Sequence, residues 1–179
     1  MTLQIAGSGY KMLTGCTGVS RLITPIGLLE VGASDSGIRF IRLMQDDSIP
    51  TLAENHHSAN AARQLGQYFD GSRKEFDVEI DFSGHTEFSV RVWHKLMEIP
   101  YGTTVSYAAL ATSLGDIKCI RAAASANGRN PIPVIVPCHR VIGSDGSLTG
   151  FALGLHVKKY LLALENPDRW RASQLSINF

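Results

Sequence analysis

The residues best suited to chemistry in this sequence are at Cys138, which a histidine and an arginine follow directly as Cys138-His139-Arg140. A cysteine thiolate is a strong nucleophile, and a neighbouring histidine or arginine favours the thiolate over the thiol. The stretch therefore predicts nucleophilic chemistry by a thiol. The alternative is a small cysteine that serves only core packing, which is the commoner role of an isolated buried cysteine.

Apolar β-branched residues surround this thiol. Val134-Ile135-Val136 precedes it and Val141-Ile142 follows it, a composition typical of buried strand. Pro137 interrupts the pattern and cannot donate to a strand ladder. We therefore expect the chain to leave a buried strand at Cys138, with packed backbone holding the side chain from both directions.

The second half of the chain is expected to be mainly helical. Capping residues and apolar spacing predict helices over residues 86–98, 107–114, 118–127 and 155–165. The second and third of these are short and close together, which makes them a helix-turn-helix candidate. In the last helix, Lys158 and Lys159 are expected to point outward. Between the third and fourth helices, Asn130 is placed to bond backbone on both sides of a turn.

The third of these helices carries one long basic side chain, Arg121, among alanines. Small side chains would let such a helix lie very close to a nucleic-acid backbone, with Arg121 as the projecting group. The alternative is an ordinary alanine-rich core helix.

The first half is expected to be a small α+β unit. Strands over residues 19–24, 28–34 and 38–44, separated by turns that contain glycine, indicate an antiparallel meander. A helix that begins after Asn55 and ends at Gly71 follows. Apolar and acidic residues then alternate over 76–82, as in a strand with one buried face.

The boundary between the two halves is expected at Ser83-Gly84-His85, so that residues 1–85 form a structural α+β domain and residues 86–179 form a second domain. Residues 1–11 and 46–50 are expected to be irregular, and the tail beyond Pro167 is expected to be loose.

Composition limits the class of protein. The chain has 179 residues, 44% of them hydrophobic, and no apolar run approaches the roughly 18 residues of a membrane span. We see no secretory signal, and three cysteines that do not form a disulfide framework favour a reduced, cytoplasmic location. The net charge of +1 divides into −3 over residues 1–85 and +4 over residues 86–179. This asymmetry suggests a polyanionic partner for the second half only.

Metal binding is not expected. His56-His57 and Cys16 match no closed zinc pattern and are interpreted as surface histidines and a packed cysteine. No metal and no organic cofactor is predicted.

Several of these features occur together in one known family. The residues that carry the resemblance are Asn130-Pro131-Ile132-Pro133, Pro137-Cys138-His139-Arg140-Val141, the Tyr107 helix, Arg121 and Glu165. In order and spacing they resemble the O6-alkylguanine-DNA alkyltransferases, also called methylated-DNA-protein-cysteine methyltransferases. The match is specific over about residues 88–165 and looser before them. It implies an N-terminal antiparallel-sheet plus helix domain that is RNase H-like, followed by a mainly α-helical domain with a helix-turn-helix.

The resemblance also implies a function and residue roles. The protein would take an alkyl group from O6-alkylguanine in DNA, and from O4-methylthymine, onto its own Cys138, once per molecule and without a cofactor. His139 would draw the thiol proton through a water, Glu165 would orient His139, and Asn130 would hold the turn. Tyr107 would stabilise the departing guanine and crowd a phosphate.

DNA binding follows from the same resemblance. Double-stranded DNA would be bound through the minor groove by a monomer with the damaged base flipped out, and Arg121 would fill the vacated stack. The DNA-binding residues it implies are Tyr107, Arg121, Ala122, Ser125 and Ala126.

The substrate pocket is expected from Val141 and Phe151-Ala152-Leu153, and here the chain departs from the family. Members commonly have Tyr-Ser-Gly-Gly or Tyr-Ala-Gly-Gly where this chain has Phe151-Ala152-Leu153-Gly154. The Ala152 N–H can still contact O6, whereas Leu153 adds bulk at the pocket rim and is expected to narrow access for large adducts.

Two other functions remain as alternatives. One is a lesion-sensing relative that flips alkylated guanine without removing the group. The other is a DNA-binding regulator that uses only the helix-turn-helix. A regulator would leave Cys138, His139 and Glu165 without a role.

Overall fold

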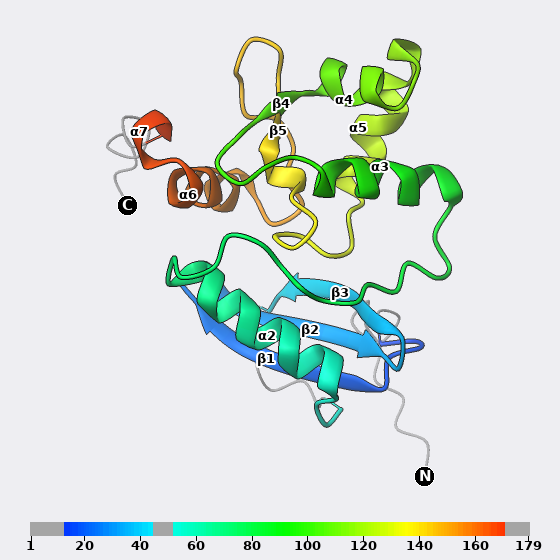
Figure 1. Cartoon of the computed structure of the whole chain (residues 1–179), viewed down its shortest axis with the longest axis vertical. Coiled ribbons are helices and arrows are strands. Elements are labelled where there is room, and N and C mark those ends of the chain that lie inside the picture. The colour runs from blue at the N-terminus through cyan, green and yellow to red at the C-terminus, as the bar shows by residue number, and fades with distance from the viewer. Residues whose placement is uncertain (1–12, 45–51, 171–179) are drawn as a thin grey trace.

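The computed structural model describes residues 13–44 and 52–170, and Figure 1 shows the chain as two halves that pack together. The expectations for residues 1–11, for residues 46–50 and for the end of the tail concern segments outside the described residues. The first half is a sheet with one helix, and the second half is mainly helical, so the α+β class is confirmed.

The sheet of the first half is the expected antiparallel meander. Strands β1 (Gly18–Thr24), β2 (Gly27–Ser34) and β3 (Gly37–Leu43) lie in the order β1-β2-β3. Each hairpin has a two-residue turn, because Thr24 pairs with Gly27 and Ser34 pairs with Gly37. Both glycines have a positive φ, 117° and 147°, which explains why glycine ends these turns.

Helix α2 (His56–Phe69) covers one face of this sheet (Figure 1). Asn55 begins it in a capping box with Ser58, as the sequence predicted for Asn55. Ala61, Leu65 and Tyr68 of this helix are fully buried, as are Leu29 and Val31 of the sheet. The N-terminal core therefore forms between the helix and the sheet face that carries these side chains.

The prediction of a full strand over residues 76–82 is wrong. The segment makes one parallel bridge, between Ile38 and Ile80, with Asp81 N donating to Ile38 O at 2.9 Å. The alternating apolar residues are still partly buried against the core, which explains the period-two pattern. The segment runs between the two halves, where β3 offers it only a short stretch of edge (Figure 1).

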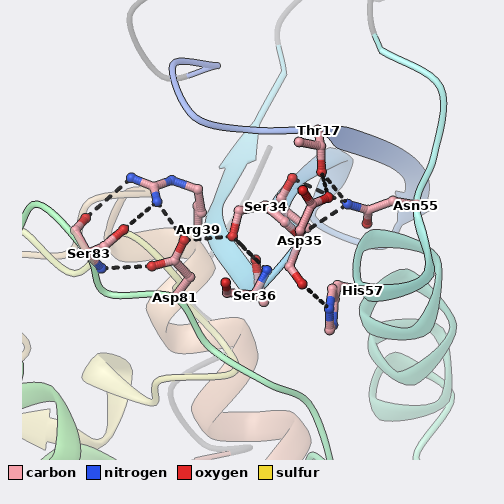
Figure 2. A network of polar contacts seen from close by, with 11 residues as sticks. Thr17, Ser34, Asp35, Ser36, Arg39, Asn55, His57, Asp81 and Ser83 are labelled. Atoms are coloured by element: carbon pink, nitrogen blue, oxygen red, sulfur yellow. Dashed lines mark hydrogen bonds and ion pairs between the residues drawn. The ribbon is translucent and has the colours of Figure 1, made fainter.

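A polar network fixes this connecting segment to the sheet (Figure 2). Arg39 Nη1 lies 2.6 Å from Asp81 Oδ2 and 2.6 Å from Ser83 Oγ. Ser34 Oγ donates to Asp81 Oδ2 at 2.6 Å. Asp81 thus joins the ends of β2 and β3 to the chain that enters the second half.

The second half contains the four expected helices, a short parallel strand pair, and a short helix at the start of the tail, where the chain was expected to be loose. Its elements are α3 (Glu87–Met97), β4 (Val105–Ser106), α4 (Tyr107–Ser113), the 3-10 turn η1 (Ile117–Cys119), α5 (Ile120–Gly128), the 3-10 turn η2 (Cys138–Arg140), β5 (Val141–Ile142), α6 (Leu155–Glu165) and α7 (Pro167–Trp170). Helices α4 and α5 pack against each other across the turn that contains η1, as expected for a helix-turn-helix. The expected helix over 118–127 is divided, because η1 occupies its first residues.

The buried strand expected before Cys138 is absent. Val134 has a positive φ of 77°, and residues 134–136 form a turn closed by a bridge between Pro133 and Val136. A β-branched residue with positive φ is unusual and holds only where surrounding packing imposes it. Val134, Ile135 and Val136 are buried as predicted, but as a compact turn. Within residues 13–44 and 52–170, no helix has the length and apolar character needed to cross a membrane.

Candidate active site

Cys138 is held at the first residue of η2 by backbone and by one side chain. Its N–H donates to Val136 O at 2.8 Å, and Asn130 Nδ2 donates to its Sγ at 2.9 Å. The residue is only 2% exposed. The thiol is therefore fixed in orientation inside the protein, as the family resemblance implied for a nucleophile held by a turn.

Asn130 fastens the turn that carries Cys138. Its Nδ2 also donates to Val136 O at 2.7 Å, while its Oδ1 accepts from Ile132 N at 3.0 Å. One buried amide thus bonds both sides of the turn, as predicted from its position before two prolines. The turn at Val134 has few other ways to satisfy its backbone, so Asn130 is central to its geometry.

Glu165, at the end of α6, accepts hydrogen bonds from three parts of the chain. Its Oε1 accepts from Tyr68 Oη at 2.8 Å and Arg140 Nη2 at 2.9 Å, and lies 2.8 Å from His139 Nε2. Its Oε2 accepts from Arg140 Nε at 2.9 Å and from Gly102 N at 3.1 Å. Burial alone would raise the pKa of Glu165, but hydrogen bonds and charge from His139 and Arg140 outweigh burial and lower the pKa to about 2. Glu165 is therefore a fixed anion at neutral pH.

This anion determines the tautomer of His139. A carboxylate only accepts hydrogen bonds, so the proton of the neutral imidazole must be on Nε2, which faces Glu165. Burial lowers the pKa of His139 below its ordinary value and outweighs the opposing effect of Glu165, so the ring is neutral at pH 7. Its Nδ1 is buried and has no partner among the residues that the structure describes. A basic nitrogen is thus left ready to accept a proton.

Arg140 serves Glu165 and not the thiol. Besides its two bonds to the carboxylate, its Nη1 donates to Ile99 O at 2.6 Å. From its place directly after the histidine, Arg140 is expected to be a structural or phosphate-facing residue and not the activator of Cys138, and its contacts with Glu165 and Ile99 are structural. Burial raises the pKa of Cys138 to about 11, against opposing effects of Asn130 and Lys158, so a base must remove the proton during reaction.

Lys158 is the main correction among the charged residues. It was expected to point outward, but it is fully buried and its Nζ donates to Val141 O at 2.7 Å and Thr149 O at 2.9 Å. Burial lowers its pKa to about 8, although the nearby Cys138 raises it. Helical spacing would have found it, because Lys158 lies three, four and seven residues before Leu161, Leu162 and Glu165, all buried.

Tyr107 and the expected pocket residues come from elements other than η2. Burial raises the pKa of Tyr107, and Cys138 adds to this increase. The ring of Phe151 lies edge-on to His139, with centroids 6.3 Å apart. Val141 is fully buried, Leu153 is partly buried against the core, and Ala152 is exposed.

Three of the four α5 residues expected to bind DNA are exposed, and one is buried. Arg121, Ala122 and Ser125 are exposed. Ala126 is fully buried, and its carbonyl accepts a hydrogen bond from Trp93 Nε1 at 2.9 Å, so Ala126 does not belong to this face. Arg129, for which no role was expected, is exposed and its Nη1 bonds Ser125 Oγ, so a second basic residue stands on the same face as Arg121.

A cavity of about 440 Å³ lies between the halves, behind this site. Tyr101, Pro137 and Arg140 are among its lining residues, whereas Cys138 is not. The cavity therefore borders Arg140, which binds the Glu165 carboxylate, and Cys138 does not line it.

Comparison with known proteins covers both halves. The family model described as 6-O-methylguanine DNA methyltransferase, DNA binding domain, matches residues 87–167, and the model described as 6-O-methylguanine DNA methyltransferase, ribonuclease-like domain, matches residues 21–82. A methylated-DNA–protein-cysteine methyltransferase of Methanosarcina acetivorans is 44% identical over 147 residues, which are 79% of this chain and 94% of the relative. One of Mycolicibacterium paratuberculosis is 46% identical over 146 residues, 79% of this chain and 88% of the relative.

Solved structures agree with the sequence relatives. The crystal structure of Mycobacterium tuberculosis O6-methylguanine methyltransferase has a TM-score of 0.74 and 40% identity, covering 84% of this chain and 93% of that one. The structure of Mycobacterium tuberculosis OGT in complex with DNA has a TM-score of 0.75 and 41% identity, with the same coverage.

Proposed function

This chain belongs to the 6-O-methylguanine DNA methyltransferase family, and on that premise we propose that it repairs DNA by moving an alkyl group from O6 of guanine to Sγ of its own Cys138. One observation carries the proposal. A buried thiol is followed by a histidine whose Nε2 faces a fixed carboxylate and whose Nδ1 has no described partner. This arrangement supplies a nucleophile and a base that is held in the correct tautomer.

The reaction is a displacement at a saturated carbon. The proton of Cys138 passes through a water to His139 Nδ1, the Sγ–C bond forms, and the bond between that carbon and O6 breaks. The guanine leaves with the bond's electron pair and takes up a proton, a step that the nearby Tyr107 hydroxyl is placed to assist. No oxyanion hole is required, because no tetrahedral acyl intermediate forms.

Each molecule acts once. The product is a thioether, which is chemically inert and has no leaving group that a weak nucleophile could displace. His139 and Glu165 can move a proton but cannot remove a carbon group from sulfur. The protein is therefore consumed in equal number to the lesions that it repairs.

DNA is bound through α4 and α5, with the damaged nucleotide rotated out of the duplex from the minor-groove side. Arg121 is the exposed long side chain that would fill the vacated stack, beside the small Ala122 and Ser125. Rotating the nucleotide out of the duplex costs a few kcal/mol, and less at a damaged base pair. O4-methylthymine is a second substrate, which would reach Cys138 by the same rotation. The protein acts as a monomer, and Phe151, Leu153 and Val141 form the pocket for the flipped base.

Two finer features belong to the same proposal. The domain boundary lies near residue 85, because the two family models end and begin at residues 82 and 87. Leu153 narrows the rim of the pocket and disfavours large adducts. Equal rates on benzyl and methyl adducts in both the Leu153→Gly variant and the native protein would contradict this role.

A titration of protein against lesion tests the transfer. A fixed amount of O6-methylguanine duplex is mixed with increasing protein, and remaining lesion is counted. We expect loss of one lesion per protein molecule, then no further loss with time. Cys138→Ala should abolish the loss yet retain lesion binding, whereas Cys16→Ala, at a partly buried cysteine of the N-terminal half, should behave as the native protein. Lesion loss with Cys138→Ala would exclude the proposal, and binding without any transfer by the native protein would favour the lesion-sensing alternative.

The DNA geometry has its own test. Arg121→Ala should slow repair in duplex DNA more than in single strands, because only the duplex has a stack to fill. Equal slowing on both substrates would contradict the role of Arg121 in flipping.

A further inference from the structure

We infer that Tyr68, a residue of the N-terminal half, is a positioning residue for alkyl transfer, because its hydroxyl shares Glu165 Oε1 with His139 and so sets how strongly the carboxylate holds the imidazole. The inference rests on the proposed function. It gives the N-terminal half, whose sequence suggested only a structural module, a direct part in the site.

The contact crosses the whole fold. Tyr68 is the next-to-last residue of α2, and its Oη donates to Glu165 Oε1 at 2.8 Å although 97 residues separate the two in sequence. The side chain is fully buried, and its ring packs against Phe69, Phe76 and Tyr101 at centroid distances of 5.3, 5.5 and 6.2 Å. Burial, followed by Glu165 itself, raises the pKa of Tyr68 well above its ordinary value, so the hydroxyl is a donor at every working pH.

Glu165 has more donors than a carboxylate readily accommodates. Five reach it, three of them at Oε1, whereas the two oxygens together offer about four lone-pair sites. Donors that share one oxygen compete for the same electron density. The Tyr68 hydroxyl therefore weakens Oε1 as an acceptor for His139 Nε2–H, and its removal should strengthen that bond.

The sign of the effect on His139 follows from this competition. A stronger bond to the carboxylate stabilises the imidazolium, so the pKa of His139 rises when the Tyr68 hydroxyl is lost. Because the neutral ring is the base, the acid limb of the rate profile then moves to higher pH. The other titratable or charged groups that face this pair stay in place in the variant: Tyr101 after α3, Cys138 and Arg140 on η2, and Lys158 on α6.

A purely structural role for Tyr68 makes a different prediction. A buried hydroxyl needs some acceptor, and losing that bond would lower stability without moving the titration of His139. Tyr101 provides the matched control, because it belongs to the same aromatic cluster and its Oη donates to Leu164 O at 3.3 Å instead of the carboxylate.

The test is the single-turnover rate of methyl transfer as a function of pH for native protein, Tyr68→Phe and Tyr101→Phe. We expect the midpoint of the acid limb to rise by about half to one pH unit in Tyr68→Phe, as one hydrogen bond of ordinary strength implies. Tyr101→Phe should keep the native midpoint. A fluorinated tyrosine at position 68, a stronger donor, should move the midpoint the other way. An unchanged midpoint in both Tyr68 variants would overturn the inference.

A second measurement separates this inference from the proposed function. The Nε2 proton of His139, observed by NMR in the free protein, should move downfield in Tyr68→Phe as its hydrogen bond shortens, and should stay in place in Tyr101→Phe. This readout needs no DNA and no reaction. If no variant transfers a methyl group but the proton moves, the proposed function fails and the coupling stands. If transfer occurs and the proton does not move, the coupling fails alone.

Discussion

Two buried glutamates bind arginine in this protein, one in each half. Glu30, on β2, lies between Arg21 of β1 and Arg42 of β3, with Nε–O distances of 3.1 and 2.8 Å. These residues are direct cross-strand neighbours on the sheet face opposite α2. Glu165 binds Arg140 with two hydrogen bonds and is equally buried. The two sites thus use the same kind of ion pair around an equally buried carboxylate, although the arginines of Glu30 are more exposed than Arg140.

The difference is the remaining partner. Glu30 is paired with two arginines, whose charge is permanent, so the cluster ties three strands together. Glu165 adds His139, whose other nitrogen is free to take a proton next to Cys138. A buried ion pair is by itself weak support for function or stability. We infer from the comparison that the titratable partner is what gives the Glu165 pair its part in the proposed reaction.

The sharpest way to break this comparison is to neutralise each glutamate. Glu165→Gln should lower the free energy of unfolding by about 3–5 kcal/mol, because it leaves the buried Arg140 uncompensated. Glu30→Gln should lower it by less, because the two arginines that it leaves unpaired are partly exposed. Only Glu165→Gln should also slow methyl transfer, by about 100-fold per folded molecule, because His139 loses the group that orients it. Stability comes from urea unfolding, and the rate comes from single-turnover assays under conditions where both variants are folded. Equal rates in the two variants would remove the distinction.

Acid should affect the Glu165 site in a defined pH window. The pKa of Glu165 is lowered to about 2, so its contribution to stability is complete above its ordinary pKa and is lost as pH falls through the folded value. The native protein should therefore lose about 3 kcal/mol of unfolding free energy between pH 5 and pH 2 from this group. Urea unfolding at a series of pH values measures it. Glu165→Gln should show a correspondingly shallower decline, and identical slopes in the two proteins would contradict the assignment.

Lys158 extends the comparison to a buried ammonium group that is bound by backbone carbonyls instead of a carboxylate. Its Nζ bonds the carbonyls of Val141 and Thr149, which joins β5 to the loop beside the thiol. Lys158→Met should lower the free energy of unfolding by about 2 kcal/mol, as loss of charge-assisted hydrogen bonds implies, and slow transfer by loosening that loop. Lys159→Met is the matched control at the next, half-buried position and should change neither quantity. Similar losses in both variants would show that Lys158 has no special role.

The parts of this structure that sequence predicts are those determined by near neighbours. The β1–β3 meander and α2 follow from turn glycines, a capping asparagine and regular apolar spacing, and all are confirmed. The sequence predicts a strand where the turn before Cys138 lies, because its β-branched residues carry no sign that Val134 must adopt a positive φ. The strand expected over 76–82 does not form, because the segment pairs with β3 at one bridge only. The local sequence does not show how much of a neighbouring strand is available for pairing.

The site shows the same division. Cys138, His139, Asn130 and Glu165 come together as predicted, because a short motif and a family pattern place them. Tyr68 was not predicted, since nothing within α2 shows that its hydroxyl meets a carboxylate 97 residues later. The burial of Lys158 was not predicted for a different reason. A lysine is expected at the surface because of its charge, although its position in the helix is on the buried face.

The central claim is that the alkyl group ends on Cys138. The most direct measurement is the intact mass of the native protein after incubation with an O6-methylguanine duplex, followed by peptide mapping of the three cysteines. We predict a protein heavier by one methylene, with the added group on Cys138 and no second addition. An unchanged mass, or a methyl group on Cys16 or Cys119, would contradict the account.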